Sequence, residues 1–233
     1  MIDWHSHVLP IMDDGSRSAE ESLSMLRMQA EQGIDTVIAT PHFYANDESV
    51  QSFLDRRARS YKRLESSLCE GLPRILLGAE VAYYSGISKM EELPTLCIEG
   101  TRLLLLEMPF SKWTEYVKKE IFELASQRRV VIILAHIERY LGLQDIKVFE
   151  ELFEFGVIMQ VNASFFCKLS TRRTAIKLLR RKAVRLIGSD AHNLSVRPPR
   201  VAEAYKYIKK KLGKDFIWSM ERYEKNLLSE YSN

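Results

Sequence analysis

Short apolar runs alternate with longer amphipathic stretches along this chain, and this alternation restricts its possible folds more than any other feature. The short runs are rich in β-branched and aliphatic residues, as buried strands are, while the longer stretches repeat their apolar residues at helical spacing. Strands that alternate with helices form parallel sheets covered by helices. The predicted strands are Ile2–His5, Thr36–Thr40, Arg74–Ala79, Leu103–Glu107, Val130–Ala135, Val157–Val161 and Val184–Gly188.

The first predicted helix begins at Ser18, where a capping box extends to Glu21, and it ends at Gly33. We expect the last twenty residues, with Trp218 and Leu227-Leu228, to form a terminal helix that packs on the sheet. The other predicted helices are Val50–Leu68, Lys112–Gln127, Ile146–Phe155, Thr171–Lys182 and Pro199–Leu212.

Seven successive β-to-α repeats place the chain in the α/β class. They favour a closed or distorted (β/α)7 barrel, similar to a TIM barrel, over an open doubly wound sheet, although periodicity alone does not separate the two. No linker rich in proline, glycine or serine interrupts the series. We therefore predict that residues 1–233 form a single domain.

Composition is that of a globular protein, with 46% hydrophobic and 28% charged residues. No stretch reaches the roughly 18 to 20 apolar residues that a membrane span needs, so we expect no membrane insertion. The net charge of +3 is small, and the basic clusters lie in helical segments, which favours solvated helix faces over a nucleic-acid surface. The three cysteines form no CxxC motif, so we expect a cytoplasmic protein without disulfides.

Every histidine of the chain lies at, or within a few residues after, the end of a predicted strand. The carboxyl ends of the strands in a parallel barrel converge on one face, where active sites form. A single histidine at such a place is more often structural, but this pattern leaves the helices without any histidine. We therefore predict one shared site for His5, His7, His42, His136 and His192.

Four carboxylates occupy equivalent positions: Asp14, Glu80, Glu107 and Asp190. Glu80 and Glu107 each end an apolar run, and a buried ionised carboxylate is unfavourable without a positive partner. Nine candidate ligands are too many for one metal ion, so we predict three ions with about three protein ligands each. Imidazole and carboxylate donors without thiolate suit Mn, Fe or Zn. Such clusters activate water and hold the oxygens of a phosphoryl group.

Two arginines follow the predicted strands close to these ligands. Arg139 comes shortly after His136, and Arg197 comes shortly after His192. A guanidinium binds phosphate oxygens through two parallel hydrogen bonds. We count Arg139 and Arg197 as candidate catalytic residues, together with His42, which is also a predicted metal ligand.

Two further features have weaker interpretations. Residues Cys167 to Arg173 match the Cys-x5-Arg spacing of cysteine-dependent phosphatases, but the segment lacks the glycine that a phosphate-binding loop normally needs. It also gives no role to the histidines, so we disfavour a thiol mechanism. Aromatic residues at predicted loops either line the mouth of the site or pack within the loops. They are Phe43, Tyr44, Tyr140 and Phe165.

The ordered motifs together resemble those of the polymerase-and-histidinol-phosphatase (PHP) superfamily. The similarity extends from Ile2 to about Arg200, and the most similar group is the bacterial tyrosine-protein phosphatases that regulate capsular and extracellular polysaccharide synthesis. His-x-His alone is weak, because amidohydrolases share it, but the combination is specific. The motifs are Asp3-Trp-His-Ser-His7, Asp13-Asp-Gly15, Ala39-Thr-Pro-His42, Gly78-Ala-Glu80, Glu107-Met-Pro109, Ala135-His-Ile-Glu-Arg139 and Ser189-Asp-Ala-His-Asn193.

The resemblance implies a distorted (β/α)7 barrel with three divalent metal ions, manganese foremost and iron or zinc as alternatives. It also implies that Arg139 and Arg197 hold phosphate and that the substrate is a phosphotyrosine in a bacterial tyrosine autokinase. The segment Asn162-Ala-Ser164, followed by Phe165-Phe166, departs from the pattern and has no assigned role. The implied ligand sets are His5, His7 and Asp190 with Glu80 bridging; Glu80, Glu107 and His136; and Asp14, His42 and His192.

Three other functions remain open at this stage. The first is a small-molecule phosphatase, above all for histidinol phosphate, because the motifs recognise phosphate and leave the rest of the substrate undefined. The second is a non-catalytic metal-binding scaffold, which the full ligand set disfavours. The third is hydrolysis of nucleic acid, which the small charge excess disfavours.

Overall fold

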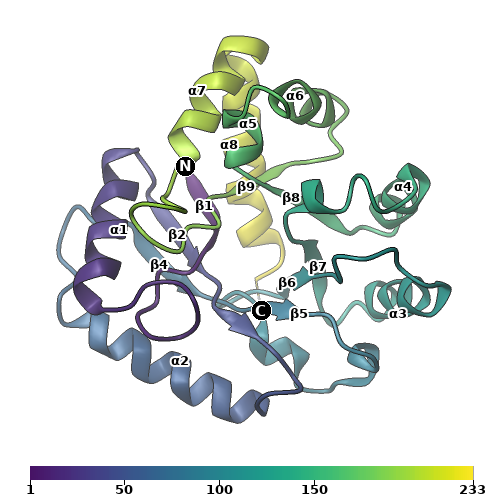
Figure 1. Cartoon of the computed structure of the whole chain (residues 1–233), viewed down its shortest axis with the longest axis horizontal. Helices are drawn as coiled ribbons and strands as arrows, with labels where there is room; N and C mark the ends of the chain where they lie inside the picture. Colours follow the sequence, from purple (N-terminus) through teal and green to yellow (C-terminus); the bar gives the residue numbers. More distant parts are fainter. Residues whose placement is uncertain (233) are drawn as a thin grey trace.

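The computed structural model describes residues 1–232 and shows an α/β fold in which helices surround a curled parallel sheet (Figure 1). The strands are β1 (Ile2–Ser6), β2 (Thr36–Ala39), β3 (His42–Phe43), β4 (Arg74–Leu77), β5 (Glu80–Ala82), β6 (Leu103–Glu107), β7 (Val131–Leu134), β8 (Ile158–Asn162) and β9 (Leu186–Gly188). The α-helices are α1 (Ala19–Glu31), α2 (Val50–Glu65), α3 (Glu115–Ser126), α4 (Ile146–Glu154), α5 (Ser164–Cys167), α6 (Arg172–Arg180), α7 (Val201–Leu212) and α8 (Lys214–Glu230). Short 3₁₀ helices lie at Ile87–Lys89, Leu93–Leu96 and Ile137–Arg139.

The strand pairs are all parallel, in the orders β1-β2-β4 and β3-β5-β6-β7-β8-β9. The two predicted strands at Thr36–Thr40 and Arg74–Ala79 each continue into a short second strand, β3 and β5, which the sequence pattern did not indicate. Pro41 lacks an N–H group and interrupts the ladder between β2 and β3. The Glu80 N–H still donates to the Pro41 carbonyl at 3.0 Å, so the pairing resumes beyond the break.

The segment after β9 returns to β1. The Asp190 N–H donates to the His5 carbonyl at 2.8 Å, and the His7 N–H donates to the Ala191 carbonyl at 2.9 Å. Ser6 and Ala191 form a parallel bridge between these segments. The predicted α/β class with a parallel sheet is therefore confirmed, while the closed (β/α)7 barrel stays a prediction.

Apolar side chains form two layers, one on each face of the sheet. Along β6, Leu104 and Leu106 belong to the layer between the sheet and the outer helices, while Leu103 and Leu105 belong to the inner layer. This alternation follows from the two-residue period of a strand. Glu107 continues the inner series, which places its carboxylate at the carboxyl end of the concave face.

The terminal helix α8 packs on the inner layer, as the sequence predicts. Leu227 is buried among strand residues there, whereas Trp218 is 56% exposed and does not join the core. At the first helix, the Ser18 hydroxyl accepts from the Glu21 N–H at 3.2 Å, which confirms the predicted start. The Glu21 carboxylate accepts from the Arg17 N–H, one residue before the expected partner. None of the described helices is both long and apolar enough to cross a membrane.

Candidate metal centre

Strand β1 and the loop after it bring the first candidate ligands to the carboxyl face. His5 and His7 are fully buried, and their Nε2 atoms lie 3.1 Å apart. The Nδ1 atom of His7 lies 2.7 Å from an Asp13 carboxylate oxygen, which also accepts from the His42 N–H at 2.9 Å. Burial by itself would lower the pKa of His7, but the Asp13 carboxylate raises this pKa well above its ordinary value. Asp13 thus orients His7, as carboxylates do for ligating histidines.

Glu80, at the start of β5, lies at the centre of the histidines. Its Oε2 atom is 3.1 Å from His5 Nε2 and 3.3 Å from His7 Nε2. The same oxygen is 3.0 Å from His42 Nδ1, yet it makes no hydrogen bond within the described residues. Burial would raise the pKa of the Glu80 carboxyl, but the neighbouring histidines hold it well below its usual range. A buried, ionised oxygen that faces three imidazoles without a hydrogen bond fits a bridging metal ligand.

His136 links Glu80 to Glu107, the last residue of β6. Its Nε2 atom lies 2.8 Å from Glu80 Oε1 and 3.2 Å from Glu107 Oε1. Burial would lower the pKa of His136, but the two carboxylates raise it to about 9. The imidazole ring is therefore protonated on both nitrogens at neutral pH. Its positive charge lies between the two carboxylates, where a metal ion would also be favourable.

Asp14, His42 and His192 form the outer part of the cluster. His192 Nε2 lies 3.1 Å from Asp14 Oδ1, and His42 Nε2 lies 3.6 Å from the same atom. The Asp14 side chain is 65% exposed, so this part faces the solvent. Burial and the nearby His7 lower the pKa of His192 to about 4, and burial lowers that of His42 as well. Both rings are therefore neutral at pH 7, the form in which imidazole binds metal.

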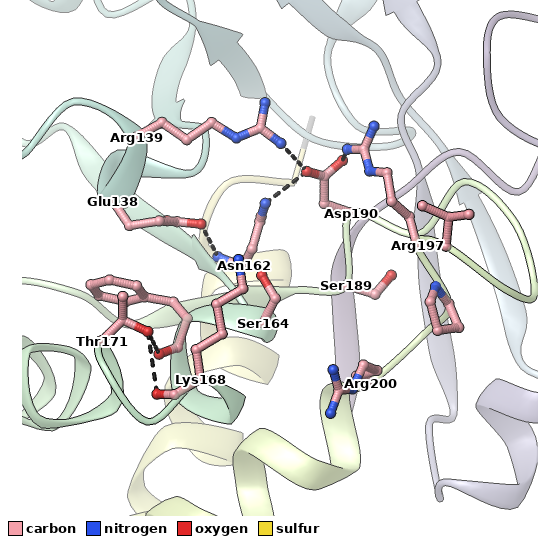
Figure 2. Close-up of a pocket in the computed structure, with 13 residues that line it drawn as sticks. Glu138, Arg139, Asn162, Ser164, Lys168, Thr171, Ser189, Asp190, Arg197 and Arg200 are labelled. Atoms are coloured by element: carbon pink, nitrogen blue, oxygen red, sulfur yellow. Dashed lines mark hydrogen bonds and ion pairs between the residues drawn. The ribbon is translucent and has the colours of Figure 1, made fainter.

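Asp190 joins the cluster to both candidate arginines (Figure 2). Its Oδ1 atom accepts from Arg197 at 2.6 Å and lies 3.5 Å from His7 Nε2. Its Oδ2 atom accepts from Arg139 at 2.5 Å and from the Asn162 amide at 2.7 Å. Burial would raise the pKa of Asp190, but His5 and His7 lower it well below its usual value. The Asp190 carboxylate is therefore ionised, and it lies between the histidines of the cluster and the two guanidinium groups.

The described residues include three groups whose donor atoms lie within 4.8 Å of one another, close enough to share an ion. One contains His5, His7 and Asp190, the first ligand set implied by the resemblance. A second group contains the implied set of Asp14, His42 and His192 with His7 added, and the third has His42 where the implied set has His136. These two groups are His7, Asp14, His42 and His192, and His42, Glu80 and Glu107. Nitrogen and carboxylate donors in such groups fit divalent transition metals.

Several residues near the site were not singled out by their sequence pattern. Asp13 lies next to the predicted ligand Asp14, and only the fold shows which of the two contacts His7. Phe110 is 53% exposed, and its ring lies tilted beside His136, at 5.9 Å between ring centroids. Of the aromatic residues considered above, Phe43 and Tyr140 lie fully in the core. Tyr44 stacks on His42 and Phe165 lines the adjacent pocket.

Cys167 is poorly suited to be a nucleophile. Its thiol donates to the Ala163 carbonyl, and burial raises its pKa to about 11. Reactive cysteines have lowered pKa values. Cys69, Cys97 and Cys167 are all free thiols. The Cys-x5-Arg spacing is therefore not supported as a catalytic motif.

Known proteins are similar to this chain over most of its length. The tyrosine-protein phosphatase CpsB of Streptococcus agalactiae serotype V is 32% identical over 236 residues, which cover 92% of each chain. The tyrosine-protein phosphatase YwqE of Bacillus subtilis is 27% identical and covers 94% of this chain and 88% of its own. One similar solved structure comes from work on YwqE of Bacillus subtilis and CpsB of Streptococcus pneumoniae, which are described there as unique metal-dependent tyrosine phosphatases. Its TM-score is 0.82 at 25% identity, and the match covers 100% of this chain and 96% of the other. Residues 1–227 match the family described as "Capsular polysaccharide synthesis, CpsB/CapC", and the chain belongs to this family.

Proposed function

We propose that this chain is a metal-dependent protein-tyrosine phosphatase that hydrolyses phosphotyrosine. The observation that carries the proposal is the position of Glu80 Oε2, buried among three imidazoles without a hydrogen bond. This arrangement fits a metal bridge, and the relatives CpsB and YwqE carry the name of tyrosine phosphatase. The family description links the chain to capsular polysaccharide synthesis. The proposed substrate protein is the bacterial tyrosine autokinase that the sequence resemblance implies.

The proposed site holds three divalent ions, with manganese as the first choice and iron or zinc as alternatives. Two histidines of β1 and Asp190 would hold one ion, and Glu80 would bridge it to a second ion beside Glu107 and His136. Asp14, His42 and His192 would hold the third. Ions bound there would supply Lewis acidity and an activated water.

The residues of this chain would orient the phosphate. Arg139 and Arg197 each use one terminal nitrogen to bond Asp190, which fixes the direction of the guanidinium groups and leaves other N–H groups for phosphate oxygens. Charge that develops on the phosphoryl oxygens would be stabilised by these fixed donors. Phenolate is a good leaving group because phenol has a pKa of about 10. His42, the first residue of β3, would contribute as an outer metal ligand.

The same proposal includes the fold and the cellular setting. The hydrogen bonds from Asp190 to His5 and from His7 to Ala191 support closure of the sheet into a distorted (β/α)7 barrel. The match over residues 1–227 supports a single domain for the whole described chain. Free thiols suit a reducing compartment, so we place the protein in the cytoplasm.

The test is a phosphate-release assay on protein stripped with a chelator, with and without added Mn²⁺. A phosphotyrosyl peptide and histidinol phosphate are offered side by side. We expect Mn²⁺-dependent turnover of the peptide. His136→Ala should abolish this turnover, because it removes the group that faces both Glu80 and Glu107, and Cys167→Ser should retain it.

Three outcomes would contradict parts of the proposal. Preference for histidinol phosphate would keep the metal chemistry and overturn the protein substrate. Turnover that survives chelation but is lost in Cys167→Ser would overturn the metal mechanism. Full activity of His136→Ala would remove His136 from the proposed ligands.

A further inference from the structure

A pocket of about 440 Å³ extends from the metal centre over the carboxyl ends of β8 and β9 (Figure 2). Asp190, Arg139 and Arg197 form the end next to the metal ligands. Lys168 and Arg200 form the outer part of the same pocket from two sides: the Lys168 side chain extends toward Asn162, and Arg200 lies at the start of α7. The remaining lining residues are Glu138, Asn162, Ser164, Phe165, Thr171, Ser189, Val196 and Pro198.

Each end of the pocket has two cationic side chains for one paired carboxylate, and the ends differ in how these charges are paired. Arg139 and Arg197 share the Asp190 carboxylate. Within residues 1–232, no carboxylate lies within ion-pair distance of the Lys168 ammonium group. Arg200 bonds Glu203 through Nε and one terminal nitrogen, which leaves its other terminal nitrogen without a partner in the described part of the chain. The outer end therefore carries positive charge available to a ligand.

The wall between the two ends suits an aromatic ring and a peptide backbone. Phe165 and Pro198 provide apolar surface, and Val196 is 84% exposed at the rim. Ser164 and Thr171 add hydroxyl groups, of which the Thr171 hydroxyl donates to the Phe165 carbonyl at 2.7 Å. A phosphate held by Arg139 and Arg197 would thus have apolar contacts beside it and cations beyond them.

We propose that the outer end of this pocket binds a second anionic group of the substrate, a carboxylate or a phosphate on a residue near the phosphotyrosine, through Lys168 and Arg200. The inference rests on the proposed phosphatase function and adds the class of substrate to it: acidic or multiply phosphorylated peptides. The carboxylate and the phosphate share the same recognition chemistry, a compact anion beside two cationic side chains.

Steady-state kinetics on synthetic phosphotyrosyl peptides test this inference. One peptide has neutral residues on both sides of the phosphotyrosine, one series has a single glutamate moved through the flanking positions, and a third has phosphoserine at the best of them. We expect the best glutamate peptide to exceed the neutral peptide about fivefold in kcat/KM at low salt, the size expected for a partly exposed ion pair. Added salt should reduce this ratio.

Variants show whether Lys168 causes the preference. Lys168→Ala should bring the ratio of acidic to neutral peptide close to one, and Lys168→Glu should favour a peptide with lysine at the same position. Lys210→Ala is the matched control, since Lys210 is exposed in the last turn of α7, outside the pocket. The control should keep the full preference. A larger ratio for phosphoserine than for glutamate would identify phosphate as the favoured anion.

The results separate this inference from the function on which it rests. Equal turnover of neutral and acidic peptides by the unmodified protein would overturn the second anion site and leave the phosphatase intact. A preference that persists in Lys168→Ala and Lys168→Glu would also overturn it. Failure to hydrolyse any phosphotyrosyl peptide in the presence of Mn²⁺ would overturn both.

Discussion

At the scale of single residues, two candidate ligands have an uncommon backbone conformation. His136 and Asp190 have positive φ angles of 31° and 52°. Such angles in residues other than glycine cost of order 1 kcal/mol and persist where the surroundings hold them in place. The Gln160 side chain accepts from the His136 N–H at 2.6 Å, and the His5 carbonyl accepts from the Asp190 N–H at 2.8 Å. Strain at the ends of β7 and β9 is thus offset by contacts from neighbouring strands.

Gly188 provides the space for one of these contacts. A Cβ atom at this position would lie 2.4 Å from His5 Cβ and 2.8 Å from the Gln160 amide nitrogen. We expect Gly188→Ala to lower the free energy of unfolding by about 1 to 3 kcal/mol, as overpacking of a core does. Chemical denaturation measures the change. Gly142→Ala is the control, because no atom lies within 4 Å of the added methyl group, and an equal effect of both would contradict the steric explanation.

The nine predicted ligands do converge in space, although their binding of metal stays a prediction. Their positions could be predicted from the sequence because an ionisable residue at the end of an apolar run is conspicuous, as Glu107 is after four leucines. The contacts of Asp13 and Asp14 could not be predicted from the sequence. Both carboxylates lie in one loop, and its turn at Gly15 determines which of them reaches His7.

At the scale of elements, β8 has a role that its sequence did not reveal. Asn162 lies at its carboxyl end and donates to Asp190, while Gln160 donates to the Asn162 amide oxygen at 3.1 Å and accepts from the His136 N–H. The two amide side chains therefore connect the candidate ligand His136, after β7, with the candidate ligand Asp190, after β9. The Asn162 segment, which had no assigned role, positions Asp190.

Replacement of Asn162 tests this connection. Asn162→Ala removes one hydrogen bond from Asp190 and leaves the buried Gln160 amide without its acceptor. We expect Mn²⁺ affinity to fall about tenfold, at the low end of effects from residues that orient ligands. Isothermal titration of the stripped protein measures the affinity. Asn226→Ala, on the exposed side of α8, is the control, and unchanged affinity in Asn162→Ala would show that Asp190 needs no support from β8.

Strand and helix positions were predictable to within a few residues because the two periods differ clearly in this chain. The two short strands β3 and β5 were missed for a local reason. Pro41 directly follows the first predicted run, and the ionisable Glu80 directly follows the second. In the sequence, either residue is indistinguishable from the end of a strand. The short helix α5 was missed because four residues are too few for a helical period.

At the scale of the whole molecule, α8 buries an ionisable group at the packed side of the sheet. The Glu224 carboxyl is 1% exposed and accepts from the Tyr205 hydroxyl at 2.7 Å. Burial raises the pKa of Glu224 from 4.5 to about 8. Between pH 4.5 and about 8, Glu224 is therefore protonated in the folded protein but ionised in the unfolded chain.

This difference predicts how stability depends on pH. Because the folded state binds more protons, the free energy of unfolding should fall as pH rises from about 4.5 to about 8, by up to about 1.4 kcal/mol per unit. Glu224→Gln keeps an acceptor for Tyr205 and carries no charge, so its stability relative to the unmodified protein should increase over this range. Denaturant titrations at several pH values, with chelator present, measure the difference. Glu230→Gln, on the exposed end of α8, should show no such increase, and parallel curves for Glu224→Gln and the unmodified protein would contradict the assignment.

The packing of α8 also places the two described chain ends on the side of the molecule opposite the candidate ligands. The Arg102 N–H, just before β6, donates to the Tyr231 carbonyl at 2.9 Å, and Met1 begins just before β1. Both described ends of the chain therefore lie at the amino ends of the strands, while the candidate ligands lie at the carboxyl ends. A tether attached at either chain end would therefore leave the pocket beside Asp190 facing away from the point of attachment. An immobilised or fused form would thus present the pocket to large protein substrates without obstruction.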